Sequence, residues 1–90
     1  MEFYYVYILL SLKDGMLYTG YSTNLKKRIE YHNKGLNTST KNRRPLKLVY
    51  SEAYINKQDA QLRERFLKSG RGREVLKKQL QNTLECAGIV

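Results

Sequence analysis

Five side chains along this chain have the chemistry to hydrolyse a phosphate ester, provided the fold brings them together. Tyr7 and Tyr18 supply phenols that accept or hold a proton, and Arg28 supplies a planar guanidinium that pairs with phosphate oxygens. His32 supplies an imidazole that polarises water or a phenol, and Glu64 supplies a carboxylate that can hold a divalent cation. These residue types predict cleavage of a phosphodiester with one bound metal ion.

Tyr7 and Tyr18 are predicted on two neighbouring strands. Residues 3–10 are apolar or aromatic on both alternating faces, which is typical of a central strand. Residues 16–21 form the returning strand after a tight turn at Asp14-Gly15. When a hairpin loop has an even number of residues, the residue numbers of two facing positions add to an odd number. The numbers 7 and 18 also add to an odd number. The two phenols, with Tyr5, are therefore expected on one face, although tyrosines also cover sheets for packing alone.

Arg28 and His32 are predicted on a helix that begins after Asn24. Leu25, Arg28, Ile29 and His32 recur at spacings of three and four, so they share one helical face. Because Leu25 and Ile29 must face the core, Arg28 and His32 are held at the edge of the sheet. An arginine in that position needs an anion, either a substrate phosphate or the partner in an internal salt bridge. A hydrogen-bonded histidine at the core edge is the other interpretation of His32.

Glu64 stands out among the eight acids by its position. The other acids fall in the turn, near the ends of the chain, in first helical turns, along a strand or on the far side of the Arg28 helix. Glu64 lies four residues after Ala60 and three before Leu67, so it adjoins a buried stripe of a helix predicted over residues 56–69. A surface ion pair with Lys68, four residues later, is the other interpretation of this spacing.

The remaining elements complete a small α+β fold. Residues 37–45 are polar and basic without periodic apolar positions, so they are predicted to form a loop. Residues 46–54 predict a third strand. Gly70-Arg71-Gly72 is expected to break the second helix, and a final helix is predicted over residues 73–84.

Composition favours a nucleic-acid partner. The 90 residues predict one domain, and 17 Lys and Arg against eight acids give a net charge of +9, which attracts polyanions. No run reaches the roughly 20 apolar residues of a membrane span, and no signal peptide is recognised, so we expect a cytoplasmic protein without membrane contact. The single cysteine, Cys86, excludes an internal disulfide and a cysteine-based zinc site.

Seven basic residues are predicted to contact phosphates. They lie on the polar loop, around the glycine break and on the last helix: Lys41, Arg43, Arg44, Arg71, Arg73, Lys77 and Lys78. Such contacts supply affinity without reading the base sequence. A solvated surface that keeps a small protein soluble is the other interpretation of each.

Taken together, these motifs resemble the GIY-YIG nuclease family, especially its small free-standing single-domain branch. Tyr5-Val6-Tyr7 stands for the first motif and Tyr18-Thr19-Gly20 for the second. The resemblance continues through Arg28, His32 and Glu64 and spans nearly all of residues 4–80. It implies a three-stranded, mainly antiparallel sheet flanked by three helices, in a domain over residues 1–85 with a tail over residues 86–90.

The resemblance also implies an activity and roles for individual residues. It implies endonucleolytic cleavage with one divalent metal, Mg²⁺ or Mn²⁺, and it assigns Tyr7, Tyr18, Arg28 and His32 to the site and Glu64 to the metal. DNA is expected rather than RNA, with structure-selective cutting as in repair or recombination, by a monomer. The alternative is a non-catalytic nucleic-acid-binding module that keeps the fold.

Three positions depart from the family pattern. Tyr5 replaces a small first residue of the opening motif, and Tyr21 stands where the repair-nuclease branch has lysine. Many members also need a downstream asparagine, for which Asn82 is the candidate. These departures affect the expected turnover more than the expected fold.

Overall fold

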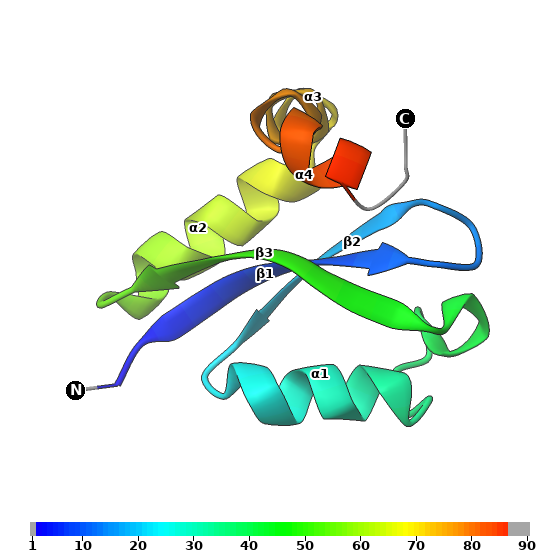
Figure 1. The fold of residues 1–90 in the computed structure, drawn as a ribbon. Coiled ribbons are helices and arrows are strands. Elements are labelled where there is room, and N and C mark those ends of the chain that lie inside the picture. Colours follow the sequence, from blue (N-terminus) through cyan, green and yellow to red (C-terminus); the bar gives the residue numbers. More distant parts are fainter. Residues whose placement is uncertain (1, 87–90) are drawn as a thin grey trace.

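Three antiparallel strands form the sheet in the computed structural model, which describes residues 2–86 (Figure 1). The strands are β1 (Tyr4–Ser11), β2 (Leu17–Ser22) and β3 (Leu46–Tyr54), and β1 lies between the other two. Residues 6–11 of β1 are buried, as expected for a central strand that is apolar on both faces. The α+β class and the antiparallel sheet predicted from the sequence are thus confirmed.

The β1–β2 hairpin places the two tyrosines on one face but has a longer turn than predicted. Tyr7 pairs with Gly20 and Leu9 pairs with Tyr18, so Tyr7 and Tyr18 are diagonal neighbours on the same face. The predicted two-residue turn is wrong, because the backbone N–H of Ser11 donates to the Met16 carbonyl at 3.0 Å and closes a loop of four residues, 12–15. Within this connection, the Asp14 carboxylate accepts a hydrogen bond from the backbone N–H of Met16 at 2.9 Å. Local capping by this side chain therefore stabilises a wider loop.

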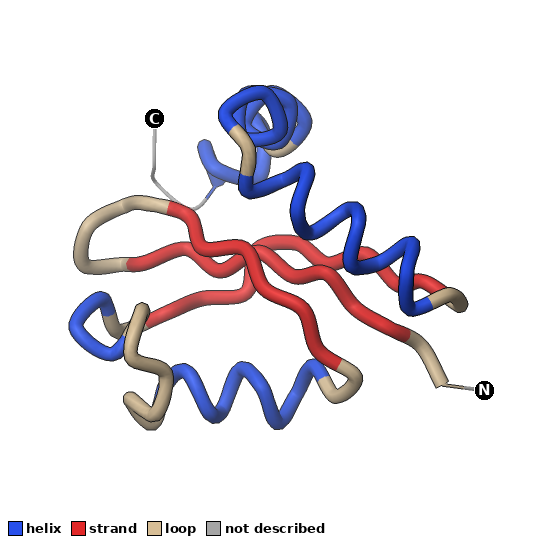
Figure 2. Tube along the Cα trace, turned by 180° about the vertical axis from the view of Figure 1, so that it is seen from behind, coloured by secondary structure: helices blue, strands red, loops and turns tan. Residues whose placement is uncertain are grey.

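Helices cover both faces of the sheet. Helix α1 (Leu25–Asn33) packs on the face that carries Tyr7 and Tyr18, and α2 (Lys57–Lys68) packs on the face that carries Val6 and Ile8. Figure 2 shows, from behind, α1 on one side of the sheet and the other α-helices on the opposite side. The apolar positions at helical spacing in both helices explain this arrangement.

Helix α2 ends at Lys68, and the glycines after it begin the next helix. Helix α3 (Gly70–Gln79) starts behind the N-cap Ser69, whose hydroxyl accepts from the backbone N–H of Gly72 at 3.1 Å. The predicted break at residues 70–72 is therefore wrong, because these residues form the first turn of α3. A Cβ on Gly72 would lie 1.8 Å from the carbonyl oxygen of Phe66, so this glycine permits the tight packing between α2 and α3.

Two further elements were not predicted. Leu80 separates α3 from a short helix α4 (Gln81–Cys86), so the described residues contain four α-helices where the sequence predicted three. The predicted loop contains a 3₁₀ turn, Lys41–Arg43, which follows the buried Thr40. Residues 87–90 of the predicted tail lie outside the described residues.

A polar cluster fixes α2 against β3. The Glu52 carboxylate accepts hydrogen bonds from Tyr50 at 2.6 Å, from Tyr54 at 2.7 Å and from Arg63 at 3.0 and 3.1 Å. Gln79 of α3 donates to the Tyr50 hydroxyl at 3.0 Å. Because Arg63 directly precedes Glu64, this cluster sets the orientation of the part of α2 that carries the predicted metal ligand.

Candidate active site

Tyr7, His32 and Thr40 form a buried chain of hydrogen bonds under the α1 face of the sheet. The Tyr7 hydroxyl lies 2.8 Å from Nε2 of His32, and Nδ1 of His32 lies 2.8 Å from the Thr40 hydroxyl. All three side chains are buried. His32 is therefore the hydrogen-bonded core histidine of the second interpretation, and its partner is a tyrosine of the predicted site.

The surroundings of His32 keep its ring neutral. Burial lowers the pKa of His32, and the nearby charge of Arg28 lowers it further. A neutral imidazole carries one proton, so one ring nitrogen donates and the other accepts. With the proton on Nδ1, the ring donates to Thr40, and Nε2 accepts the hydrogen of the Tyr7 hydroxyl.

Gly20 makes room for the Tyr7 phenol. A Cβ on Gly20 would lie 2.3 Å from both Cζ and the hydroxyl oxygen of Tyr7. The Tyr7 ring thus crosses β2 directly over this residue, which is its cross-strand partner. Any side chain at position 20 would displace the hydroxyl from His32.

Gly20→Ala is therefore expected to break the Tyr7–His32 contact and to lower the free energy of unfolding by about 1–3 kcal/mol, as overpacking does. Urea unfolding measures the loss, and the imidazole ¹⁵N shifts of His32 report the lost hydrogen bond. Gly70→Ala is the matched control, because a Cβ there meets nothing within 4 Å. Unchanged His32 shifts in Gly20→Ala would contradict this placement of Tyr7.

Arg28 faces the Tyr7 hydroxyl with a donor that has no partner. The nearby Tyr7 hydroxyl is the main cause that raises the pKa of Arg28. Its Cζ lies 4.6 Å from the centre of the Tyr31 ring, and its Nε is buried without a hydrogen-bond acceptor in residues 2–86. The ion pairs of these residues do not include Arg28, so the internal salt bridge is not observed there.

Tyr18 lies closer to the surface than Tyr7. Its ring centre is 5.1 Å from that of His32, at an interplanar angle of 64°, so the imidazole contacts both phenols. Tyr18 is half-buried, whereas Tyr7 is completely buried. The fold therefore brings together four of the predicted site residues: Tyr7, Tyr18, Arg28 and His32.

Glu64 comes from the opposite face of the sheet. It lies beside the buried Ala60 and Leu67 on α2, as predicted, and its carboxylate binds Nζ of Lys68 at 3.1 Å. The Lys68 pair is thus present. Burial is the main cause that raises the pKa of Tyr7, and the Glu64 charge contributes to the same shift. Glu64 therefore acts electrostatically on Tyr7, although the two residues belong to different layers.

The side chain of Glu64 suits a hard, hydrated cation. No group of three or more His, Cys, Asp and Glu side chains gathers within residues 2–86. A lone carboxylate leaves the other coordination positions to water and substrate oxygens, as Mg²⁺ and Mn²⁺ accept. The Glu64 side chain is 21% exposed, and Lys68 already places a positive charge against it. These donors fit one divalent ion that is held weakly without substrate.

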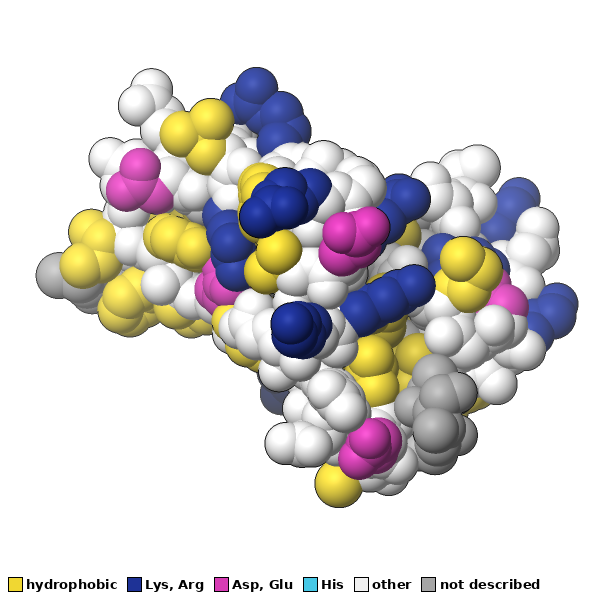
Figure 3. Space-filling view, turned by 90° about the horizontal axis from the view of Figure 1, so that it is seen from above, with side chains coloured by type: hydrophobic (Ala, Val, Ile, Leu, Met, Phe, Trp, Pro, Cys, Tyr) yellow, Lys and Arg dark blue, Asp and Glu magenta, His cyan; other side chains and the backbone are white. Residues whose placement is uncertain are grey.

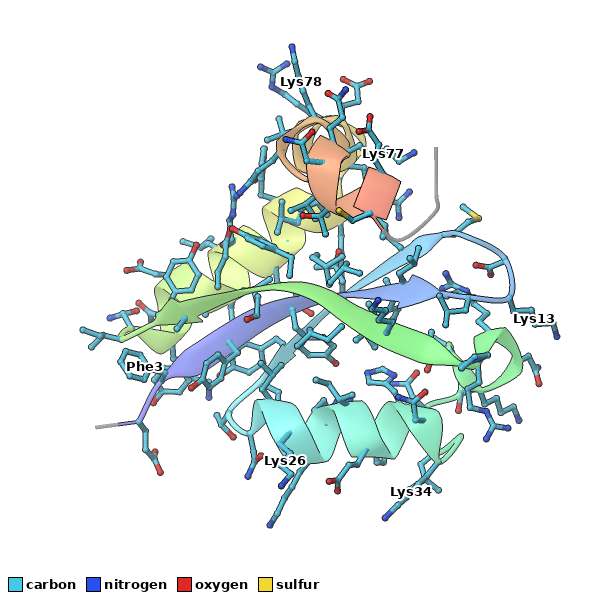
Figure 4. All side chains as sticks on the ribbon, in the orientation of Figure 1. Phe3, Lys13, Lys26, Lys34, Lys77 and Lys78 are labelled. Carbon is cyan, nitrogen blue, oxygen red and sulfur yellow. The ribbon has the colours of Figure 1, made fainter. Side chains whose placement is uncertain are left out.

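A groove of about 880 Å³ runs between the β1–β2 hairpin and the helices α2 and α3. Tyr18 and Thr19 line it together with Lys68, Arg73 and Lys77. Figure 3 shows Lys and Arg side chains spread over the face that carries α3, and Figure 4 shows Lys77 and Lys78 on that helix. The groove therefore places a positively charged wall beside Tyr18, whose side chain packs on the α1 face of the sheet.

The predicted basic residues divide into two groups. Lys41, Arg71, Arg73, Lys77 and Lys78 are exposed. Arg43 binds Asp14 at 2.7 Å, which holds the pKa of Asp14 at about 2, and Arg44 donates to the Lys41 carbonyl at 2.8 Å. Arg43 and Arg44 thus have structural partners, and their contact with phosphate stays a prediction.

Comparison with known proteins identifies the family. The sequence model of the GIY-YIG catalytic domain matches residues 3–79. The chain belongs to the GIY-YIG family. This family consists of nucleases that act on phosphodiester bonds, and its members act on nucleic acid.

Small bacterial proteins of the GIY-YIG family resemble this chain over most of its length. A UPF0213 protein of Clostridium perfringens is 52% identical over 65 residues, which cover 71% of this chain and 69% of the relative. A UPF0213 protein of Staphylococcus haemolyticus is 45% identical over 78 residues, covering 86% and 94%. The solution NMR structure of a UPF0213 protein from Bacillus halodurans matches with a TM-score of 0.54 at 39% identity, covering 86% of this chain and 84% of that one.

Asn82 does not lie with the other candidate residues of this GIY-YIG chain. It lines a second groove, between α4 and β3, together with Lys47, Leu48 and Val49. β3 and β2 are the two edge strands of the sheet, so this groove lies on the β3 side, away from the one lined by Tyr18. The structure therefore gives no support to Asn82 as the downstream asparagine.

Sequence reasoning missed three residues of this GIY-YIG site. Thr40 holds His32, but it sits in a polar segment whose composition gives no sign of burial. Gly20 was assigned only to a motif, and its contact with Tyr7 follows from the hairpin register. Tyr21 was seen only as a departure from the family pattern, and its hydroxyl is buried without a partner in residues 2–86.

None of the helices in residues 2–86 is long and apolar enough to cross a membrane.

Proposed function

We propose that this protein is a metal-dependent endonuclease that cuts phosphodiester bonds in DNA, selected by structure rather than by sequence. The observation that carries this proposal is the buried, unpaired Nε of Arg28 beside the Tyr7 hydroxyl. A guanidinium donor without an acceptor inside the protein is available to bind an anion, and a phosphate offers two oxygens to the planar donors of the guanidinium. In this role Arg28 holds the scissile phosphate and stabilises the charge that develops on it.

Tyr7 and His32 form the proton path in this proposal. Burial raises the pKa of Tyr7, so its phenol keeps its proton at neutral pH. The lowered pKa of His32 leaves Nε2 free to accept. Tyr7 therefore takes a proton from the attacking water while its own proton passes to His32. Tyr18, which is half exposed, positions the water or the phosphate at the entrance.

Glu64 is the proposed ligand of the divalent ion, Mg²⁺ or Mn²⁺. When bound, such an ion supplies positive charge near the phosphate and lowers the pKa of coordinated water. Lys68 then has to leave the carboxylate, because two cations compete for the same oxygens. The 3.1 Å ion pair thus orients the Glu64 carboxylate in the absence of metal.

The positively charged groove is the proposed route of the nucleic-acid strand. Arg73 and Lys77 on its wall bind phosphates, and Lys41, Arg71 and Lys78 extend the charge beyond it. Contacts of this kind make affinity fall steeply with salt, without sequence preference. A small domain that binds phosphates without contacting base edges suits substrates defined by their structure, such as the junctions and flaps of repair and recombination.

Glu64→Gln is expected to lower the cleavage rate at least about 100-fold while affinity for nucleic acid is retained, since only charge stabilisation in the transition state is lost. Branched, single-stranded and duplex DNA, and RNA, incubated with Mg²⁺, Mn²⁺ or EDTA, measure this. Glu30→Gln, an exposed acid on α1, is the matched control and should cut like the wild type.

Two outcomes of this assay would change the proposal. Full activity of Glu64→Gln would refute the metal assignment. Tight binding by the wild type without metal-dependent cleavage would favour the non-catalytic nucleic-acid-binding module. The position of Asn82, remote from the groove lined by Tyr18, is the observation that keeps this second function in view.

A further inference from the structure

The hydroxyl of Tyr21 is buried and has no hydrogen-bond partner in residues 2–86. Tyr21 pairs with Val6 in the hairpin, so its side chain points to the α2 face, opposite to Tyr7 and Tyr18. A buried hydroxyl without a partner costs folding free energy, and phenylalanine would fill the same space without that cost. The Tyr21 hydroxyl is therefore available to donate to an acceptor that comes within reach.

Tyr21 faces the stripe of α2 that contains Glu64. It packs in the apolar cluster with Ala60 and Leu67, the two residues that flank Glu64 on the helix surface. Tyr4 stacks on it with ring centres 6.4 Å apart and planes only 7° from parallel, which fixes the ring. Burial and Tyr4 are the main causes that raise the pKa of Tyr21, and the Glu64 charge adds to them.

We propose that Tyr21 is a positioning residue for Glu64, whose carboxylate accepts the Tyr21 hydroxyl hydrogen when it holds a divalent cation. This inference rests on the metal site of the proposed function. In the structure Lys68 holds one carboxylate oxygen at 3.1 Å. Glu64 would hold the cation through one carboxylate oxygen in place of Lys68, and its other oxygen would accept the hydrogen of the Tyr21 hydroxyl. Carboxylates that bind metals are hydrogen-bonded by such neighbours, whose loss weakens metal binding about 10–100-fold.

The test compares two substitutions that each remove one tyrosine hydroxyl from the same side of the sheet. Tyr21→Phe removes the unpaired hydroxyl, and Tyr54→Phe removes one that donates to Glu52 at 2.7 Å. Urea unfolding without metal should show unchanged or higher stability for Tyr21→Phe and lower stability for Tyr54→Phe. A purely structural role of the Tyr21 hydroxyl would instead lower the stability of Tyr21→Phe as well.

Metal binding is measured by titrating Mn²⁺ into ¹⁵N-labelled protein and following paramagnetic broadening of the Glu64 amide signal, which reports weak binding too. In Tyr21→Phe the same broadening should need about tenfold more Mn²⁺ than in the wild type, whereas Tyr54→Phe should match the wild type. Equal titrations for Tyr21→Phe and wild type would overturn the role of Tyr21 and leave the metal site standing. Absence of broadening at Glu64 in the wild type would overturn both.

Discussion

Arg28→Ala is expected to lower the cleavage rate about 10²–10³-fold, the usual cost of removing one charged or polar donor from a transition state. The guanidinium is placed by Tyr31 at 4.6 Å and by the Tyr7 hydroxyl, and its buried Nε has no other acceptor within residues 2–86. Stability should change little, because no internal ion pair of the described residues is lost. Single-turnover cleavage at saturating protein measures the rate.

The controls for Arg28 separate geometry from charge. Lys26→Ala removes one positive charge from the same helix at an exposed position that points away from the sheet in Figure 4, and it should leave the rate unchanged. Arg28→Lys keeps the charge but loses the planar pair of donors, so it should recover little activity. Equal rates for Arg28→Ala and Lys26→Ala would rule out a role of Arg28 in the chemical step.

Glu52→Ala is expected to lower the free energy of unfolding by about 1–3 kcal/mol, the cost of leaving hydrogen-bond donors away from water without their acceptor. The Glu52 carboxylate is 14% exposed and accepts from Arg63, Tyr50 and Tyr54. All three donors lose this acceptor together. Urea unfolding measures the loss, and Glu74→Ala, an exposed acid on α3, should change stability by no more than about 0.5 kcal/mol.

The same carboxylate makes stability depend on pH. Burial alone would raise the pKa of Glu52, but the hydrogen bonds from Arg63, Tyr50 and Tyr54 outweigh it and hold the pKa below its ordinary value. The contribution of Glu52 to the free energy of unfolding is therefore present above about pH 4.3, the pKa of a glutamate in the unfolded chain. It is lost as the pH falls through the lower pKa that Glu52 has in the folded protein. Below that pH the wild type and Glu52→Ala should converge, and parallel curves down to acid pH would contradict this account.

Local patterns predicted most of the elements and half of the site geometry. The alternation of apolar residues placed the three strands, and the odd sum of positions 7 and 18 placed both phenols on one face whatever the even loop length. The helical spacing of Leu25, Arg28, Ile29 and His32 likewise put Arg28 and His32 beside the sheet. These predictions succeed because each depends on a single period within one or two adjacent elements.

The remainder depends on contacts between distant segments. Gly72 reads as a helix breaker, yet it lies in the first turn of α3, where the Phe66 carbonyl occupies the place of a side chain. Thr40 is buried by its bond to His32, which no local pattern shows. Glu64 has the spacing of a core-edge residue, but which face of the sheet α2 covers is decided by chain crossing and packing. Sequence periodicity carries no information on that choice.

Arg28 and Glu64 belong to the two helical layers on opposite faces of the sheet. In the proposed function, binding a substrate and cleaving it therefore have different structural requirements. Arg71, Lys77 and Lys78 would keep their charge on a chain whose second layer is loosened. In the proposed mechanism, in contrast, the Glu64 carboxylate and the Arg28 guanidinium act on one phosphate only when both layers are docked. Under the proposed function, an incompletely folded copy would accordingly bind nucleic acid without cutting it, because cleavage would require the correctly folded domain.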